Sequence, residues 1–279
     1  MRIFIAGAGG FVGGALIRRL SGHELVLPTR DPGRLEAAAP GFSYPLFSGD
    51  LEGLVRAAAP DVVINLLGII AERPGAGFRL VHEEYTRRLL AGARAAGAGK
   101  FVQMSALGAA PDSPSAYLRS KYAGELAVRA GGVPYIIFRP SYIDGPGQRL
   151  RSELAAMARF LPVFAAPSDA WAAPVPVEDV ADCFARAVQD AALRDEIFEL
   201  GGGRAVSFRE IVAKALADSG VRRPVLGLPL AFFRPLLPLF ALLPSAPMTR
   251  EQYLMLSASG APSGKYRGVA DLLGRGPAL

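Results

Sequence analysis

The sequence predicts an α/β fold, in which a doubly wound parallel sheet is joined to a smaller C-terminal α/β lobe. Short runs of β-branched residues alternate with helical patterns through the first half of the chain. A glycine-rich turn follows the first run directly, and the alternation gives way after Pro140 to shorter elements. Such alternation indicates right-handed crossovers onto one sheet, whose ligands bind beyond the carboxyl ends of its strands.

The elements of the first lobe follow from hydrophobic periodicity. Strands are predicted at residues 3–6, 25–28, 62–67, 101–104 and 135–138. Helices are predicted between them, including one over residues 79–96 and one that begins at Ser113-Pro114, because serine caps a helix and proline is tolerated at its first position. The fifth strand places the lobe boundary near Pro140, so residues 1–140 form the first lobe.

The rest of the chain predicts a smaller lobe over residues 141–256 and a loosely held tail over residues 257–279. A strand is expected at residues 198–200, before three glycines. Ser207 and Glu210 form a capping-box pattern that begins a helix reaching about Asp218. The tail is rich in glycine, serine and proline, a composition typical of loosely held chain ends.

Composition narrows the class of protein. The chain has 279 residues, 51% of them hydrophobic and 20% charged, which is typical of a globular protein. Its net charge of +6 is spread without long basic runs, so we expect no nucleic-acid partner. Cys183 is the only cysteine and there are two histidines, which argues against a disulfide framework and a metal site. With a strand pattern at its start, the chain is expected to be cytoplasmic.

The segment from Leu226 to Leu243 is the most apolar stretch of the sequence. It carries Arg234 and three prolines, which make it a poor membrane-spanning helix. We expect two short helices that pack in the second lobe. The alternative is a surface that docks a membrane complex or another protein, which would place the chain peripherally at the inner membrane.

The turn between the first strand and the first helix predicts a dinucleotide site. It reads Gly7-Ala8-Gly9-Gly10-Phe11-Val12-Gly13. Gly7 permits the tight turn, Gly10 lets phosphates approach the backbone, and Gly13 lets the helix pack close to the strand. Phe11 and Val12 then face the sheet or the cofactor. A pyrophosphate can bind the free N–H groups at this helix N-terminus, as in a Rossmann-type fold.

The end of the second strand bears on the choice of dinucleotide. Arg30 would pair with the 2′-phosphate of NADP(H), whereas Asp31 would accept a hydrogen bond from the free ribose hydroxyl of NAD(H). Arg30 comes first, and a guanidinium group binds phosphate with two hydrogen bonds. The sequence therefore favours NADP(H), with NAD(H) as the alternative.

These motifs resemble the extended and atypical short-chain dehydrogenase/reductase superfamily. The Gly-x-x-Gly-x-x-Gly spacing, Gly49-Asp50-Leu51, Asn65-Leu66-Leu67-Gly68 and Phe138-Arg139-Pro140 all agree with it. The resemblance implies further cofactor-binding residues, namely Asp50, Leu51, Leu66, Gly68 and Pro140. Many members self-associate, so a homo-oligomer is compatible with the resemblance.

A Tyr-x-x-x-Lys pair suggests a catalytic group. Tyr117 and Lys121 lie four residues apart on one face of a predicted helix. The resemblance implies that Tyr117 exchanges a proton with a carbonyl or alcohol, that Lys121 binds the nicotinamide ribose, and that Ser105 holds the substrate oxygen. An ammonium ~4 Å from the phenol could lower its pKa by about three units. A packing role beside the cofactor is the alternative for Tyr117, and for His82 we expect a structural role.

Several segments resemble one branch more closely, that of the nucleotide-binding accessory subunit of respiratory complex I and its bacterial relatives. They include Val81-His82-Glu83, Met104-Ser105-Ala106-Leu107-Gly108 and Pro247-Met248-Thr249-Arg250-Glu251-Gln252. We therefore carry two hypotheses: an oxidoreductase that passes hydride between NADP(H) and a carbonyl or alcohol, and a non-catalytic subunit that holds NADPH for structure or redox sensing. A sugar-nucleotide epimerase or dehydratase is less favoured.

Overall fold

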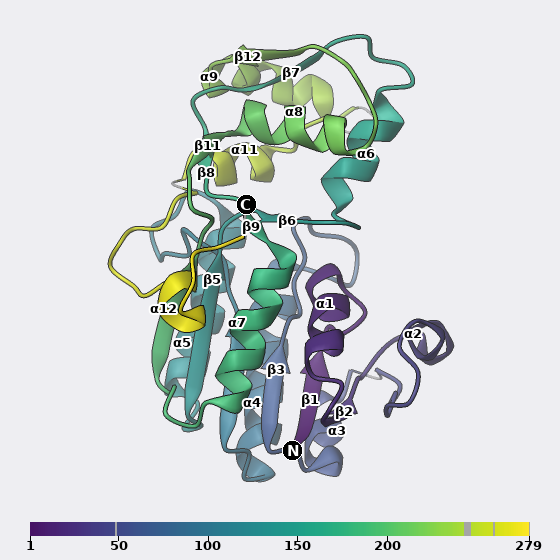
Figure 1. The fold of residues 1–279 in the computed structure, drawn as a ribbon, viewed down its shortest axis with the longest axis vertical. Helices are drawn as coiled ribbons and strands as arrows, with labels where there is room; N and C mark the ends of the chain where they lie inside the picture. Colours follow the sequence, from purple (N-terminus) through teal and green to yellow (C-terminus); the bar gives the residue numbers. More distant parts are fainter. Residues whose placement is uncertain (48, 243–246, 259, 279) are drawn as a thin grey trace.

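A six-stranded parallel sheet forms the base of the molecule (Figure 1). The computed structural model describes residues 1–47, 49–242, 247–258 and 260–278. The strands lie in the order β10-β5-β4-β3-β1-β2, with bounds β1 (Arg2–Ala6), β2 (Glu24–Val26), β3 (Val62–Asn65), β4 (Lys100–Met104), β5 (Tyr135–Pro140) and β10 (Glu196–Leu200). The predicted α/β fold is confirmed, although β2 and β3 end two residues earlier than expected.

Helices cover both faces of this sheet. One face carries α1 (Phe11–Arg19), α7 (Val177–Gln189) and α12 (Val269–Leu273); the other carries α3 (Leu51–Ala58), α4 (Tyr85–Ala95) and α5 (Ala116–Ala130). Alternation along β1 explains the two cores. Ile3 and Ile5 pack with Leu16 and Phe184, whereas Phe4 packs on the opposite side with Val55. A short α2 (Pro32–Ala38) follows β2.

Two helices of the first lobe differ from the sequence prediction. The predicted helix at residues 79–96 begins with a π-helical turn, η1 (Arg79–Glu84), which continues into α4. Helix α5 starts two residues later than Ser113-Pro114 predicts, because the Ser115 side chain accepts the capping hydrogen bond from the Leu118 N–H.

The second lobe lies beyond the carboxyl ends of the strands. Its core is formed where Leu154, Phe164, Val212 and Leu216 meet. The helices are α6 (Arg149–Met157), α8 (Phe208–Asp218), α9 (Leu230–Phe233), η2 (Arg234–Leu236), α10 (Leu237–Phe240) and α11 (Arg250–Leu256). Paired short strands are β6 (Ile143–Asp144) with β9 (Val175–Pro176), β7 (Phe164–Pro167) with β12 (Val225–Leu228), and β8 (Trp171–Ala172) with β11 (Val206–Ser207). The capping box of Ser207 and Glu210 begins α8, as predicted.

The chain divides between the lobes differently from the predicted ranges 1–140, 141–256 and 257–279. Helix α7 and strand β10 return to the first lobe, where β10 pairs with β5 and Phe198 lies opposite Phe138. The predicted loose tail also returns, because Val269 and Leu272 of α12 are buried against this core. The predicted lobe ranges were wrong here because local composition does not indicate contacts between residues that are distant in the sequence.

The apolar segment from Leu226 contains the end of β12, then α9, η2 and α10, so its first part is a strand rather than a helix. Leu243 lies outside the described residues. Within the described ranges, no helix has the length and apolar character needed to cross a bilayer. The same residues contain no cluster of three His, Cys, Asp or Glu side chains that could hold a metal ion.

Candidate functional site

Two glycines of the first turn have conformations or surroundings that a side chain would disturb. Gly7 has a φ of 89°, and a Cβ there would lie 3.0 Å from the Leu66 carbonyl carbon. The Gly10 N–H closes the turn by donating to the Gly7 carbonyl at 3.0 Å. A Cβ at Gly13 would lie only 2.2 Å from the Ala8 carbonyl oxygen, which brings α1 directly against the turn.

The N-terminus of α1 fits the pyrophosphate of a dinucleotide. Gly10 is the N-cap residue and no side chain caps the helix there, which leaves backbone N–H groups for an anion. Gly9 faces open space, since a Cβ there would meet nothing within 4 Å. Val12 is buried in the core, whereas the half-buried Phe11 ring lies against the Gly145 backbone of the second lobe.

The acidic and basic side chains that follow β2 differ in their contacts. The Asp31 side chain accepts a hydrogen bond from the Arg34 N–H at 3.1 Å and caps α2. Arg30 is exposed, and so is Arg34, a second cation that our sequence reasoning missed. One oxygen of the acid that would select NAD(H) is thus engaged in capping, while two guanidinium groups stand exposed beside the strand end.

The other predicted cofactor residues divide into two kinds. Leu66 and Gly68 follow β3 at the carboxyl edge, where a Cβ on Gly68 would lie 3.1 Å from the Lys121 Nζ. Asp50 caps α3 by accepting from the Gly53 N–H at 2.9 Å. The Leu51 side chain is fully buried in the core, so only its backbone could face a ligand. Pro140 is buried at the end of β5, where its carbonyl accepts from the Leu107 N–H.

Lys121 lies between the ends of two central strands. Its ammonium group donates to the carbonyl of Met104 at 3.2 Å and to that of Leu67 at 3.5 Å. The side chain is almost fully buried, and burial lowers the Lys121 pKa to about 8, against the opposing effect of the nearby Glu125 carboxylate. The ammonium is 6.0 Å from the Tyr117 ring centroid, so the predicted pair does come together.

The phenol of Tyr117 is not activated in the way that the sequence suggested. Burial raises the Tyr117 pKa to about 12, whereas a neighbouring cation was expected to lower it. Lys121 directs its charge at two backbone carbonyls. The ring packs edge-on against Phe78 and His82, with centroids 5.9 and 5.4 Å away. Tyr117 therefore keeps its proton at neutral pH.

Ser105 belongs to a buried ion-pair network. Its hydroxyl donates to Glu125 Oε1 at 2.5 Å, and Arg139 binds both oxygens of that carboxylate, through Nε at 2.8 Å and through Nη2 at 2.5 Å. All three residues are buried. The hydroxyl expected to hold a substrate oxygen is thus committed to Glu125, and the network fastens β4, α5 and β5 to one another.

His82 supports the backbone around Tyr117. Its Nε2 accepts from the Ile69 N–H at 3.1 Å, so the ring proton is on Nδ1, which faces the Ser120 hydroxyl at 2.8 Å. Ser120 in turn donates to the Tyr117 carbonyl at 2.7 Å. Burial, and then the Lys121 charge, lower the His82 pKa to about 2. The histidine is therefore a neutral hydrogen-bonding link, in agreement with the structural role expected for it.

Glu251 is a residue near the site that the sequence did not indicate. From α11 in the second lobe, its carboxylate accepts from the Tyr117 N–H at 2.9 Å and from the Ser115 hydroxyl. A carboxylate at a helix N-terminus is also favoured by the helix dipole. The capping box of Thr249 and Gln252 predicts α11 itself, but no local pattern relates Glu251 to a helix 134 residues earlier.

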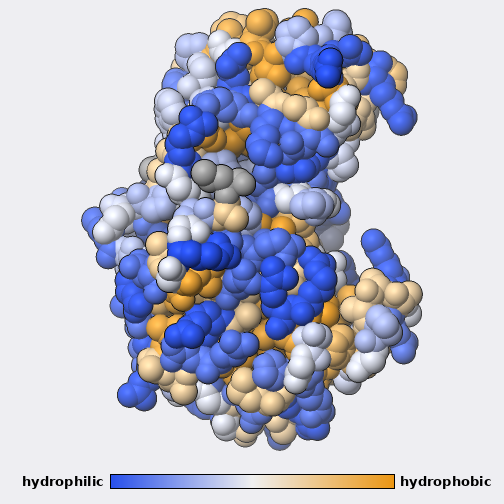
Figure 2. Space-filling model, viewed as in Figure 1, coloured by the Kyte–Doolittle hydropathy of each residue, from blue (hydrophilic) through white to orange (hydrophobic). Residues whose placement is uncertain are grey.

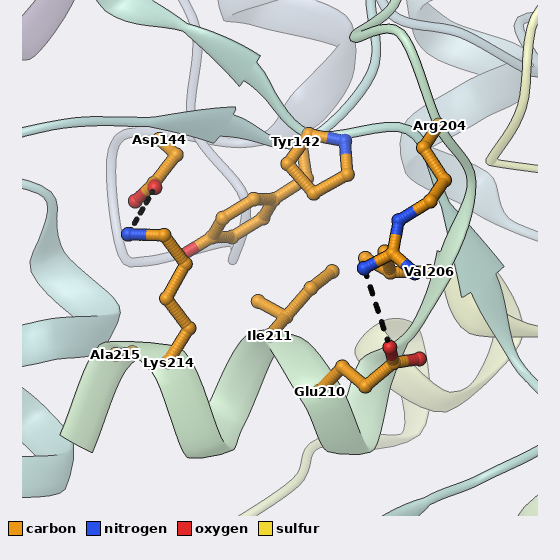
Figure 3. A pocket seen from close by; sticks show the side chains of 9 residues that line it. Tyr142, Asp144, Arg204, Val206, Glu210, Ile211, Lys214 and Ala215 are labelled. Atoms are coloured by element: carbon orange, nitrogen blue, oxygen red, sulfur yellow. Dashed lines mark ion pairs between the residues drawn. The ribbon is translucent and has the colours of Figure 1, made fainter. Parts of the chain in front are cut away.

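A separate cavity of about 150 Å³ lies in the second lobe between β6 and α8 (Figure 3). The Tyr142 ring points into it, and its hydroxyl is buried with no hydrogen-bond partner among the described residues. Ion pairs flank the cavity, with Lys214 bound to Asp144 at 3.4 Å. The apolar wall includes Ile211. Neither Tyr117 nor any other side chain predicted from the sequence to be functional lines this cavity.

Comparisons with known proteins identify the family and the relatives of this chain. The family model described as "NAD dependent epimerase/dehydratase family" matches residues 3–201. Ceramide reductase from Caulobacter vibrioides is 37% identical over 189 residues, or 64% of this chain. NADH dehydrogenase (ubiquinone) 1 alpha subcomplex subunit 9 from Arabidopsis thaliana mitochondria is 30% identical over 213 residues, or 71% of this chain. The matches span only 58% and 53% of those two proteins.

Solved structures share the fold over nearly the whole chain. An NADPH-dependent quinone oxidoreductase from Escherichia coli, complexed with NADPH, has a TM-score of 0.73 and 21% identity, with 99% of this chain and 96% of that chain covered. UDP-glucuronic acid 4-epimerase from Bacillus cereus has a TM-score of 0.72 and 18% identity, with coverage of 100% and 95%. The predicted resemblance to the extended short-chain dehydrogenase/reductase superfamily is confirmed. The chain belongs to the NAD dependent epimerase/dehydratase family.

Proposed function

We propose that the protein is an NADPH-dependent oxidoreductase that reduces a carbonyl group to an alcohol. The observation that carries the proposal is the position of Lys121 and Tyr117, one helical turn apart on α5, with the Lys121 ammonium between the ends of β3 and β4. This is the edge of the sheet at which ligands of such folds bind. The names of the ceramide reductase and of the quinone oxidoreductase support the same reaction class.

The proposed chemistry divides between the cofactor and the chain. When bound, NADPH supplies the hydride to the carbonyl carbon. The neutral Tyr117 hydroxyl donates the proton that the carbonyl oxygen takes up, so hydride and proton together make the alcohol. In this proposal the Lys121 ammonium holds a ribose hydroxyl of the cofactor and stabilises negative charge on the phenol oxygen after the proton has left. The Glu251 and Ser120 contacts hold the Tyr117 backbone at its N–H and its carbonyl.

Removing the Tyr117 hydroxyl tests the catalytic proposal. With a panel of ketones and quinones, Tyr117→Phe is expected to reduce the rate of NADPH oxidation by about 10²- to 10⁴-fold, the usual contribution of a general acid. Stopped-flow absorbance of NADPH measures the rate, and fluorescence titration should show unchanged NADPH affinity. Tyr85→Phe, in α4, is the matched control and should leave the rate unchanged. Equal rates for Tyr117→Phe and wild type would refute the role of the phenol.

Arg30 is proposed to bind the 2′-phosphate of NADPH. Arg30→Ala should weaken NADPH binding by about 10- to 100-fold, since a hydrogen bond to a charged group is worth ~1.5–3 kcal/mol, and should leave NADH binding unchanged. Isothermal titration with both dinucleotides measures this. Arg94→Ala serves as the control, because that exposed arginine lies in the last turn of α4. An equal loss of affinity for both dinucleotides would contradict the proposal.

A second candidate is a subunit that holds NADPH without turning it over. The hydrogen bond from the Ser105 hydroxyl to Glu125 favours this non-catalytic role. Because that hydroxyl already donates to Glu125, it does not donate to a substrate oxygen beside Tyr117. The relative named as a subunit of NADH dehydrogenase is in accord with this alternative. Retention of NADPH over hours, with no acceptor reduced by the wild-type protein, would favour the subunit over the enzyme.

A further inference from the structure

The end of the second lobe exposes apolar side chains that come from two segments. Residues 160–163 and 226–242 are brought side by side because β7 pairs with β12, with Ala165 opposite Leu226. We call this surface the tip; its exposed apolar members are Phe160, Leu161, Val163, Leu226, Phe232, Leu239 and Leu242. Phe160 is 86% exposed and Leu242 80% exposed, values that belong to side chains with almost no cover.

The tip lies at the end of the molecule opposite the N-terminus. Strands β7 and β12 and helix α9 are together there (Figure 1), and Figure 2 shows hydrophobic surface over the same end with hydrophilic residues between. Single exposed apolar residues are ordinary, but an exposed apolar group formed by two chain segments indicates a surface that binds a partner.

The charges of the tip indicate what kind of partner covers it. Residues 159–168 and 221–242 contain no aspartate or glutamate, and they carry Arg159, Arg222, Arg223 and Arg234. All four arginines are exposed. Elsewhere on the surface arginines are commonly paired with acids, as Arg87 is with Glu83. One acid lies at the edge of the tip, the exposed Asp169, whose carboxylate accepts a hydrogen bond from the Leu230 N–H at 2.6 Å. A surface that is apolar and has four arginines against this one carboxylate is complementary to an anionic bilayer, where headgroup phosphates meet the arginines and acyl chains meet the apolar side chains.

The backbone of the tip suits a surface that lies on the membrane. Pro229, Pro235 and Pro238 divide the apolar segment into the short elements α9, η2 and α10. Such elements cannot span a bilayer, but they present side chains to an interface. We propose that the tip binds the surface of a bilayer that contains anionic phospholipid. This inference does not depend on catalytic turnover.

Vesicle sedimentation tests the proposal on the full chain. Wild type should sediment with vesicles of phosphatidylglycerol and phosphatidylcholine, should remain in solution with pure phosphatidylcholine, and should be released by added salt. The pair Phe160→Ser and Leu242→Ser, and separately the pair Arg222→Gln and Arg223→Gln, should each weaken binding by at least about tenfold. Leu126→Ser, which removes an exposed leucine of α5 in the other lobe, should bind like wild type.

The outcomes that overturn the proposal are distinct. Wild type that does not bind the mixed vesicles, or binding that neither variant pair weakens, refutes it. If the free protein self-associates and the apolar pair abolishes that association in size-exclusion chromatography, the tip is a protein interface and the lipid proposal is wrong. NADPH titration of every variant verifies that the fold is intact and keeps this test separate from that of the proposed reductase.

Discussion

Replacing Glu125 with alanine is expected to lower the free energy of unfolding by about 3–5 kcal/mol. The Glu125 side chain is 1% exposed, and it binds Arg139, which is 10% exposed, through two hydrogen bonds. Removing the carboxylate leaves a guanidinium charge buried without its partner, and it also leaves the Ser105 hydroxyl without its acceptor. Urea denaturation followed by circular dichroism measures the change.

Two controls separate this effect from a simple loss of packing. The double variant Glu125→Ala with Arg139→Met should be less destabilised than Glu125→Ala alone, because the guanidinium charge is then no longer buried without its partner. Glu83→Ala, which breaks the exposed i,i+4 pair with Arg87, should cost only ~0.5 kcal/mol. If Glu125→Ala and Glu83→Ala had similar small effects, the network around Ser105 would not be holding the three elements together.

Acid should destabilise the protein through His82. Its folded pKa is about 2, against an ordinary value of 6.5, so the histidine is neutral in both states above pH 6.5 and contributes no pH dependence there. Below pH 6.5 the unfolded chain takes up a proton that the folded protein does not. Stability then falls by up to ~1.4 kcal/mol per pH unit, or about 3 kcal/mol by pH 4.5.

Comparison with His82→Gln isolates this contribution, because the other titrating groups are common to both proteins. At pH 7 the variant should be less stable than wild type, since it loses the ring packing against Phe78 and Tyr117. Between pH 6.5 and 4.5 the difference should narrow by about 3 kcal/mol. His23→Gln serves as the matched control for histidine removal. If the free energies of unfolding of wild type and His82→Gln changed with pH in parallel, His82 would take up its proton in the folded protein as readily as in the unfolded chain, and the prediction would be wrong.

The sequence predicted the first five strands well because their signals are local. Runs such as residues 3–6 are apolar enough to be buried on both faces, and the glycine spacing fixes the turn that follows. Strand β10 was also recognised as a strand, but its partner β5 could not be read from local pattern. Pairing depends on contacts between residues as distant as Phe138 and Phe198. The same limit explains the wrong assignment of α7 and of the tail.

The candidate site shows a similar division. Tyr117 and Lys121 were found because four-residue spacing puts two side chains on one helix face. The direction of the Ser105 hydroxyl was missed, because it depends on the carboxylate of Glu125 twenty residues later and on Arg139 in the next strand. The raised pKa of Tyr117 was missed for a related reason, since burial by Phe78 and His82 outweighs a single expected cation.

The return of the chain to the first lobe has a consequence for its synthesis. A ribosome that has released only residues 1–140 has produced five parallel strands, of which β5 has an unpaired edge that β10 later occupies. The apolar surface that Phe184 and Phe198 later cover is also still open at that stage. The sheet gains its sixth strand only when residues 196–200 have emerged, and α12 covers the same lobe later still. Until then the exposed strand edge and apolar surface are open to the non-native contacts from which chaperones protect a nascent chain.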